Sequence, residues 1–152
     1  MPLESVTEKL ISKLKSCPKY VVNPDSPFRV GGGITRCIFD VAAVGGGNLF
    51  ELYLRDNRNS LKRSNFSCGL IWVSPATERL TLCRYNGDSH CHVNLLEKEE
   101  IVHQYHIHLA TERYITAGLK PEAYAVPCNA YTTLAGALKC LADDWHITGL
   151  PE

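Results

Sequence analysis

Two adjoining segments with alternating side chains constrain the fold most strongly. Residues 34–44 and 48–57 alternate apolar and polar side chains, and Gly45-Gly46-Gly47 separates them. A period of two residues is typical of a β-strand with one buried face. Glycine tolerates the backbone conformations that a tight turn needs. The sequence therefore predicts a β-hairpin that offers one apolar face to a core and a more polar face to solvent or a site.

Three further segments have the character of strands. Residues 66–74 and 79–85 predict a second hairpin across Pro75-Ala76-Thr77, and residues 104–110 predict a fifth strand. Residues 19–33 contain two prolines and three consecutive glycines, which is typical of a connector. We therefore expect a mostly antiparallel sheet of about five strands.

Helical periodicity appears at the two ends of the chain. Leu3, Val6, Leu10 and Leu14 recur at helical spacing until Pro18 ends the pattern. Near the C-terminus, Asn129 is a candidate N-cap. The apolar side chains that follow it at helical spacing are Leu134, Leu138, Leu141 and Trp145.

Together these segments predict a single α+β domain over residues 1–152, with both helices on one face of the sheet. A chain of 152 residues has the size of one ordinary domain. The second face of the sheet is then left available for a site.

Composition narrows the class of protein. Sixteen Lys and Arg residues balance sixteen Asp and Glu residues, which argues against a protein that coats DNA but allows a local basic patch. No apolar run approaches the ~20 residues of a membrane span, and no secretory leader pattern is present. The seven cysteines are scattered without a C-x-x-C pair. We therefore expect a cytoplasmic protein that does not bind membranes.

The most informative local pattern is a group of histidines. Five of the six histidines fall within nineteen residues, namely His90, His92, His103, His106 and His108. In an extended segment, residues two apart point to the same side. His106 and His108 should therefore lie together, opposite Tyr105, Ile107 and Leu109, and His90 and His92 should form a similar pair if their segment is extended.

Three interpretations of these histidines remain open. In the first, His106 and His108 act as acid and base on a phosphodiester, with His90 as a third polar group. In the second, His103, His106 and His108 bind zinc. In the third, the histidines bond backbone carbonyls and line a polar face or an interface. The first needs no cofactor because RNA supplies its own 2′-hydroxyl nucleophile.

Cationic side chains near these histidines are candidates for phosphate contacts. Arg84 and Arg113 would stabilise the charge on phosphorus, although Glu112 and Arg113 also fit the solvated start of a helix. The basic segment 55–63 offers four further candidates for binding phosphate, with Asp56 as its single acidic residue. These four are Arg55, Arg58, Lys62 and Arg63.

The chain also resembles a known family over roughly residues 50 to 145. The stretch from Arg84-Tyr85-Asn86-Gly87 through His90 and Asn94 to His106-Ile107-His108, and then Tyr124-Ala125-Val126-Pro127, is similar to an uncharacterised "domain of unknown function" family of small bacterial proteins. Its pattern contains N-G-x-x-H-x-N and H-x-H, and it does not include Cys91 and His92. The resemblance implies importance for His90, Asn94, His106 and His108, and we take Asn94 as a binding residue.

Proteins of that family resemble the cargo of mobile elements, phage-related islands and toxin–antitoxin pairs. We therefore expect a small histidine-dependent endoribonuclease or phosphodiesterase of bacterial toxin or phage-defence type. The first alternative is a non-enzymatic interaction module, such as an antitoxin-like protein or a phage-encoded inhibitor. Its partner would be a cognate antitoxin or a defence protein. The second alternative is a metal-dependent hydrolase.

Overall fold

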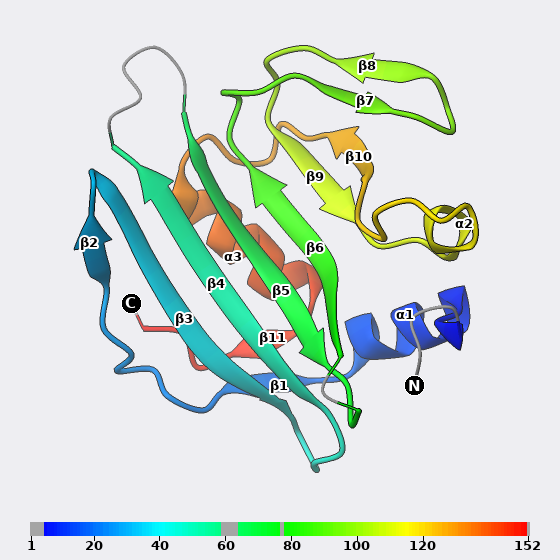
Figure 1. The fold of residues 1–152 in the computed structure, drawn as a ribbon. Coiled ribbons are helices and arrows are strands. Elements are labelled where there is room, and N and C mark those ends of the chain that lie inside the picture. Colours follow the sequence, from blue (N-terminus) through cyan, green and yellow to red (C-terminus); the bar gives the residue numbers. More distant parts are fainter. Residues whose placement is uncertain (1–4, 59–63, 77, 152) are drawn as a thin grey trace.

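A mostly antiparallel sheet dominates the fold (Figure 1). The structure is a computed structural model that describes residues 5–58, 64–76 and 78–151. Within these residues the sheet has nine strands, in the order β10-β9-β6-β5-β4-β3-β1-β11, with β2 paired to β3 outside this path. The long strands are β3 (Ile34–Ala43), β4 (Leu49–Asn57), β5 (Phe66–Val73) and β6 (Arg79–Asn86). The short strands are β1 (Lys19–Val21), β2 (Arg29–Gly31), β9 (His106–Leu109), β10 (Tyr124–Pro127) and β11 (Ile147–Thr148).

The expected α+β class and the antiparallel sheet are confirmed, but the expected number of about five strands is wrong. The five predicted segments correspond to β3, β4, β5, β6 and β9. The four additional strands β1, β2, β10 and β11 are two to four residues long. Such segments are too short to show a period of two residues, and pairing with a neighbouring strand decides their conformation. β1 and β2 lie in the segment expected to be a connector.

The strand order joins segments that are distant along the chain. β9 pairs with β6, although a separate hairpin of β7 (His92–Asn94) and β8 (Glu99–Ile101) lies between them in sequence. β10 then pairs with the other edge of β9. The hairpin stands beside β9 and β10 in Figure 1, outside the main sheet. This order places the two histidines of β9 directly beside β6.

Three helices occur among the described residues: α1 (Glu8–Ser16), α2 (Glu112–Thr116) and α3 (Leu134–Asp144). A threonine side chain caps each N-terminus by accepting a backbone N–H three residues further on. In α3 this residue is Thr133, so the expected N-cap at Asn129 is wrong. The hydroxyl of Thr133 meets the free N–H of Gly136 at 3.0 Å, whereas Asn129 lies before the first helical turn. No helix in the described part of the chain is long and apolar enough to cross a lipid bilayer.

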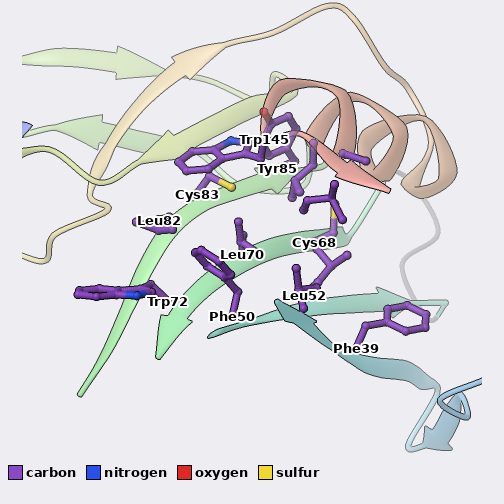
Figure 2. Close-up of a cluster of buried hydrophobic side chains, with 14 of the residues drawn as sticks. Phe39, Phe50, Leu52, Cys68, Leu70, Trp72, Leu82, Cys83, Tyr85 and Trp145 are labelled. Atoms are coloured by element: carbon purple, nitrogen blue, oxygen red, sulfur yellow. The ribbon is translucent and has the colours of Figure 1, made fainter. Parts of the chain in front are cut away.

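The core lies between α3 and one face of the sheet. α3 contacts β5, β6 and β11. Phe50, Leu52, Leu70 and Tyr85 point from the sheet towards this layer, where Trp145 closes the end of α3 (Figure 2). Burying each large apolar side chain stabilises the fold by about 1.5–3 kcal/mol. Because side chains alternate along a strand, the residues between these core positions form the opposite face of the sheet.

A buried lysine joins the ends of the two long helices. The ammonium group of Lys19 donates hydrogen bonds to the backbone carbonyls of Lys15 at 3.0 Å, Cys17 at 2.9 Å and Trp145 at 2.7 Å. Carbonyls at a helix C-terminus lack partners within the helix and carry partial negative charge. Burial lowers the pKa of Lys19. Lys19 therefore has a structural role, with all three donors satisfied.

Candidate active site

His106 and His108 lie side by side on β9, on the face of the sheet that α3 does not cover. Both side chains are buried, and their ring centroids are 5.1 Å apart. His92 of β7 completes a group of three, with its ring centroid 4.6 Å from that of His108 and 6.2 Å from that of His106. His106 and His108 lie on the same side of β9, as a period of two residues predicts. His92 lies beside them because the β7–β8 hairpin lies next to β9 and β10.

Hydrogen bonds define which ring nitrogen carries the proton. The Nδ1–H of His106 donates to the Gln104 carbonyl at 2.8 Å, and the Nδ1–H of His108 donates to the Glu122 carbonyl at 2.9 Å. A carbonyl can only accept, so both Nδ1 atoms are protonated. Nε2 of His106 then accepts from the Asn86 amide at 3.3 Å. Among the described residues, no hydrogen bond engages Nε2 of His108.

His92 has the opposite tautomer. Asn94 accepts the Ala125 N–H through Oδ1 at 2.8 Å and donates to the Ala125 carbonyl through Nδ2 at 2.7 Å, which defines the orientation of its amide. The 3.0 Å contact from His92 Nε2 to Asn94 Oδ1 therefore requires a proton on Nε2. Each of the three imidazoles thus has one N–H bonded to the protein and a second nitrogen that can accept.

The pKa values of the two β9 histidines are lowered. Burial is the main cause for both, and nearby positive charge on other histidines and on Arg84 adds to it. The pKa of His108 falls to about 3, and that of His106 falls below its ordinary value of 6.5. Both rings are therefore neutral near pH 7, and each can accept a proton but cannot supply one.

The histidines line a cavity of about 310 Å³. Its polar lining includes Arg84, Asn86, Lys120 and Glu122 beside His90, His92, His106 and His108. The Glu122 carboxylate accepts from Arg84 at 3.1 Å and lies 3.8 Å from the Lys120 ammonium. Among the described residues, the cavity therefore combines four imidazoles with two cations and a single carboxylate.

A second cavity of about 390 Å³ adjoins the first, because Arg84, Asn86 and His90 line both. Tyr53, Arg55 and Ser67 complete much of its polar wall. Arg84 donates through Nε to the Tyr53 hydroxyl at 3.0 Å, and Arg55 donates to the Asn65 side chain at 3.1 Å. No carboxylate of the described residues lines this cavity.

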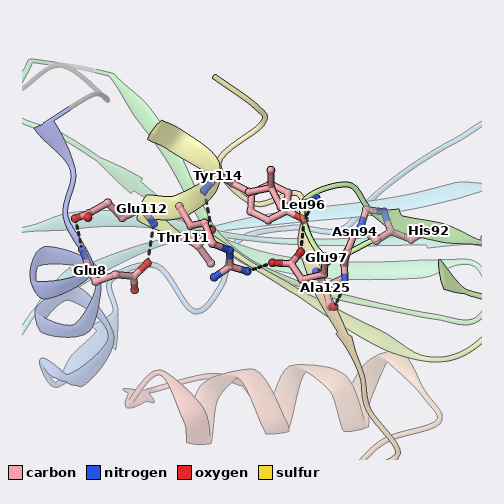
Figure 3. A network of polar contacts seen from close by, with 10 residues as sticks. Glu8, His92, Asn94, Leu96, Glu97, Thr111, Glu112, Tyr114 and Ala125 are labelled. Carbon is pink, nitrogen blue, oxygen red and sulfur yellow. Dashed lines mark hydrogen bonds and ion pairs between the residues drawn. The ribbon is translucent and has the colours of Figure 1, made fainter. Parts of the chain in front are cut away.

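The β7–β8 hairpin is held in place by polar contacts at its turn (Figure 3). Asn94, the last residue of β7, bonds the Ala125 backbone of β10. Within the turn, Glu97 accepts from the Tyr114 hydroxyl at 2.6 Å, and the same hydroxyl accepts the Leu96 N–H at 3.2 Å. Arg113 also pairs with Glu97. These contacts position His92 over β9.

The structure unites some predicted residues and separates others. His90, His106, His108 and Arg84 line one cavity, and Arg55 lines the adjoining one. Arg113 starts α2, pairs with Glu97 and lies outside both cavities, so its expected place beside the histidines is not found. β9 ends at Leu109 and Thr111 caps α2, so the chain has left the sheet before it reaches Arg113.

The remaining candidates for binding also have other positions. Arg58 lines a separate cavity with Asp56 and Leu134. Asn94 is 2% exposed, and its side chain bonds His92 and the Ala125 backbone, so it positions the hairpin. Lys62 and Arg63 lie outside the described residues.

The zinc interpretation named His103 as the third ligand, and the structure places His103 elsewhere. Its exposed ring donates to the Asp88 carbonyl at 3.2 Å, on the turn after β8, while His92 stands beside His106 and His108. In the part of the chain that the structure describes, no three His, Cys, Asp or Glu side chains are arranged to hold a metal ion.

Sequence reasoning missed several residues of the site. The family pattern does not include His92, so the sequence does not predict it as a site residue, yet His92 bonds Asn94. Glu122 and Lys120 lie in a loop without periodicity, so no local pattern could identify them. Only the pairing of β9 with β10 brings that loop to the histidines.

Comparison of the chain with known proteins finds no matching family, no matching curated protein and no matching solved structure. The resemblance drawn from the sequence therefore stays a prediction.

Proposed function

We propose that this chain is a histidine-dependent phosphodiesterase that cleaves RNA. The observation that supports this proposal is the meeting of four histidines with Arg84 and Lys120 in one cavity. Acid–base groups and cations in reach of one bound group are what phosphodiester cleavage requires. A role in bacterial toxin or phage-defence systems is part of the proposal through the family resemblance alone.

The cleavage step uses neutral His108 as the base. Its Nε2 takes the proton of a ribose 2′-hydroxyl, and the 2′-oxygen bonds to phosphorus. The bond from phosphorus to the 5′-oxygen breaks, and His90, exposed at the cavity mouth, gives a proton to the leaving oxygen. The products are a 2′,3′-cyclic phosphate and a 5′-hydroxyl. His108 then loses its proton to water, and His90 regains one.

These roles revise the expected pair of His106 as acid and His108 as base, or the reverse. Both rings are neutral near pH 7, so the proton donor has to be another group of the cavity. A bound phosphate is negative, and a negative charge near an imidazole raises its pKa. Substrate binding would therefore make His108 a stronger base at the time when a base is needed. Arg84 and Lys120 would stabilise the charge on phosphorus.

The test is cleavage of a defined RNA by the purified chain with EDTA present. We expect products that end in a 2′,3′-cyclic phosphate, and no cleavage where the reacting nucleotide has a 2′-deoxyribose. His108→Gln should lower kcat at least 100-fold, since a base contributes about 10²–10⁴-fold. The variant His106→Ala/His108→Ala should be inactive.

His103→Gln is the matched control, because it removes an exposed histidine outside the cavity. It should keep the wild-type rate, and thermal unfolding of every variant separates loss of activity from loss of the fold. Cleavage that disappears with EDTA would assign the histidines to a metal-dependent hydrolase. Absence of cleavage under every condition would overturn the proposal.

The second candidate is a protein-interaction module, and the surface of the β7–β8 hairpin favours it. Val93, Leu95, Leu96 and Val102 are large apolar side chains that are exposed on this one hairpin. Exposed apolar side chains that gather in one place mark interaction surfaces. Inactivity towards RNA would make this the leading candidate.

A further inference from the structure

One line of side chains crosses the open face of the sheet from its β2 edge to the histidines. The residues on this line are direct partners in neighbouring antiparallel strands, so their side chains share one face. We call this line the transverse row. In the order β2, β3, β4, β5, β6 and β9 it consists of Arg29, Arg36, Arg55, Ser67, Asn86 and His106. At about 4.8 Å per strand it spans roughly 24 Å.

The first half of the transverse row is strongly cationic. Arg29, Arg36 and Arg55 stand directly opposite one another, and like charges in such positions destabilise a sheet. No carboxylate of the described residues forms an ion pair with any of the three. The acidic residues that β3 and β4 present on this face, Asp40 and Glu51, lie four residues further along their strands, about 13 Å away. An anionic ligand would offset the repulsion among these arginines.

Cavities lie beside the row at its β2 edge and again along its second half. Arg29 and Arg36 line a cavity of about 580 Å³ at the β2 edge. Arg55, Ser67 and Asn86 line the cavity of about 390 Å³, which continues into the histidine cavity. An extended ligand could therefore follow the arginines to the proposed catalytic histidines.

Two further features suit a nucleotide chain. The ring of Tyr53 packs over Gly69 of β5, because a Cβ atom on that glycine would come within 2.6 Å of the ring. Tyr53 also lines the cavity of about 390 Å³. Aromatic rings in such grooves stack bases. The Oδ1 atom of Asn86 is buried and has no hydrogen-bond partner among the described residues. A base amine or a ribose hydroxyl would satisfy it.

We propose that the transverse row binds the phosphate backbone of a single-stranded nucleic acid and leads it across the strands to the histidines. This inference extends the proposed function, and it rests on that function for the claim that the strand is cleaved at the histidine end of the row. A single strand fits because the cations form one line, whereas a duplex presents two backbones. Because the charges of the whole chain balance, attraction of a phosphate backbone has to come from local groups of cations such as this row.

The test is fluorescence anisotropy with a 12-nucleotide RNA whose 2′-oxygens are methylated, so that it cannot be cleaved. The variant Arg29→Gln/Arg36→Gln removes two charges of the row. The control Lys9→Gln/Lys13→Gln removes two exposed charges of α1. We expect at least tenfold weaker binding for the arginine variant and a salt slope lower by about 1.4, because each phosphate contact on a single strand contributes about 0.7. The control should bind like the wild type.

The outcomes separate this inference from the proposed function. The proposed role of the transverse row would be overturned, even if RNA is cleaved, by an unchanged affinity of the arginine variant or by an equal loss of affinity in the variant and the control. Binding that depends on Arg29 and Arg36 in a chain that cleaves no RNA would retain the row and reject the catalytic proposal. A DNA strand of equal length should bind similarly, because the row contacts phosphates. Preference for a duplex over the single strand would overturn the inference.

Discussion

The guanidinium of Arg84 lies 3.1 Å from the Glu122 carboxylate, while the backbone carbonyl of the same Glu122 accepts the Nδ1–H of His108 at 2.9 Å. One residue therefore orients both the cation and the base of the proposed site. Its side chain is almost completely buried. The pair links β6 to the loop before β10, so this part of the site depends on the order of strands in the sheet.

Replacing the Glu122 carboxylate tests how far this part of the structure depends on its pair with Arg84. Glu122→Gln should lower the free energy of unfolding by about 1–3 kcal/mol, because it leaves the partly buried Arg84 without its charged partner. Urea denaturation measures the change. Glu51→Gln is the matched control, since Glu51 pairs with the exposed Arg79 and should change stability by less than about 1 kcal/mol. Equal effects of the two substitutions would contradict the expectation.

The amide of Asn94 is one of the groups that hold the hairpin carrying His92. Asn94→Ala removes both hydrogen bonds to the Ala125 backbone and should destabilise the fold by about 2–4 kcal/mol, since two buried backbone groups lose their partners. In this variant, amide hydrogen exchange should become faster in residues 92–101 by a larger factor than in β5. The control is Asn129→Ala, at an exposed position before α3. Unchanged exchange in the hairpin would show that Asn94 does not hold it.

Gly69 is required by close contacts on β5. A Cβ atom at this position would lie 2.6 Å from the ring of Tyr53 and 2.7 Å from the Cys83 carbonyl. Gly69→Ala should therefore lower the free energy of unfolding by about 1–3 kcal/mol through overpacking. Adding Tyr53→Ala should restore only part of the lost free energy of unfolding, because the contact with the Cys83 carbonyl remains. Gly31→Ala, which has open space around its Cβ, should leave thermal unfolding nearly unchanged.

The lowered pKa of His108 predicts how stability changes with pH. Between about pH 6.5 and about pH 3, the unfolded chain holds a proton on His108 that the folded chain lacks. Stability due to this group is therefore complete above pH 6.5 and is lost as the pH falls towards 3. The slope approaches 1.4 kcal/mol per pH unit for one such group.

His108→Gln should flatten this part of the profile, measured as urea midpoints at successive pH values from 7.5 to 4.5. The exposed His146, whose φ of 57° suits asparagine, provides the control His146→Asn, which should retain the wild-type slope. A His108→Gln profile as steep as that of the wild type would contradict the assignment.

Local periodicity was sufficient for much of the fold. The alternation in β3 and β4 predicted both strands, their buried faces and the turn at three glycines that have positive φ angles. The same period predicted that His106 and His108 share a face of β9. These properties depend on residues two apart along one segment, and each segment contains enough residues to show them.

Tertiary structure decided everything that depends on which strands pair. β6 and β9 are neighbours only because β7 and β8 leave the sheet between them, and this pairing places Arg84 and Asn86 beside the histidines. The register of β2 with β3 aligns Arg29 with Arg36, although β2 is three residues long. Pairing and register follow from burying one face of the whole sheet against α3, and no single segment carries that information.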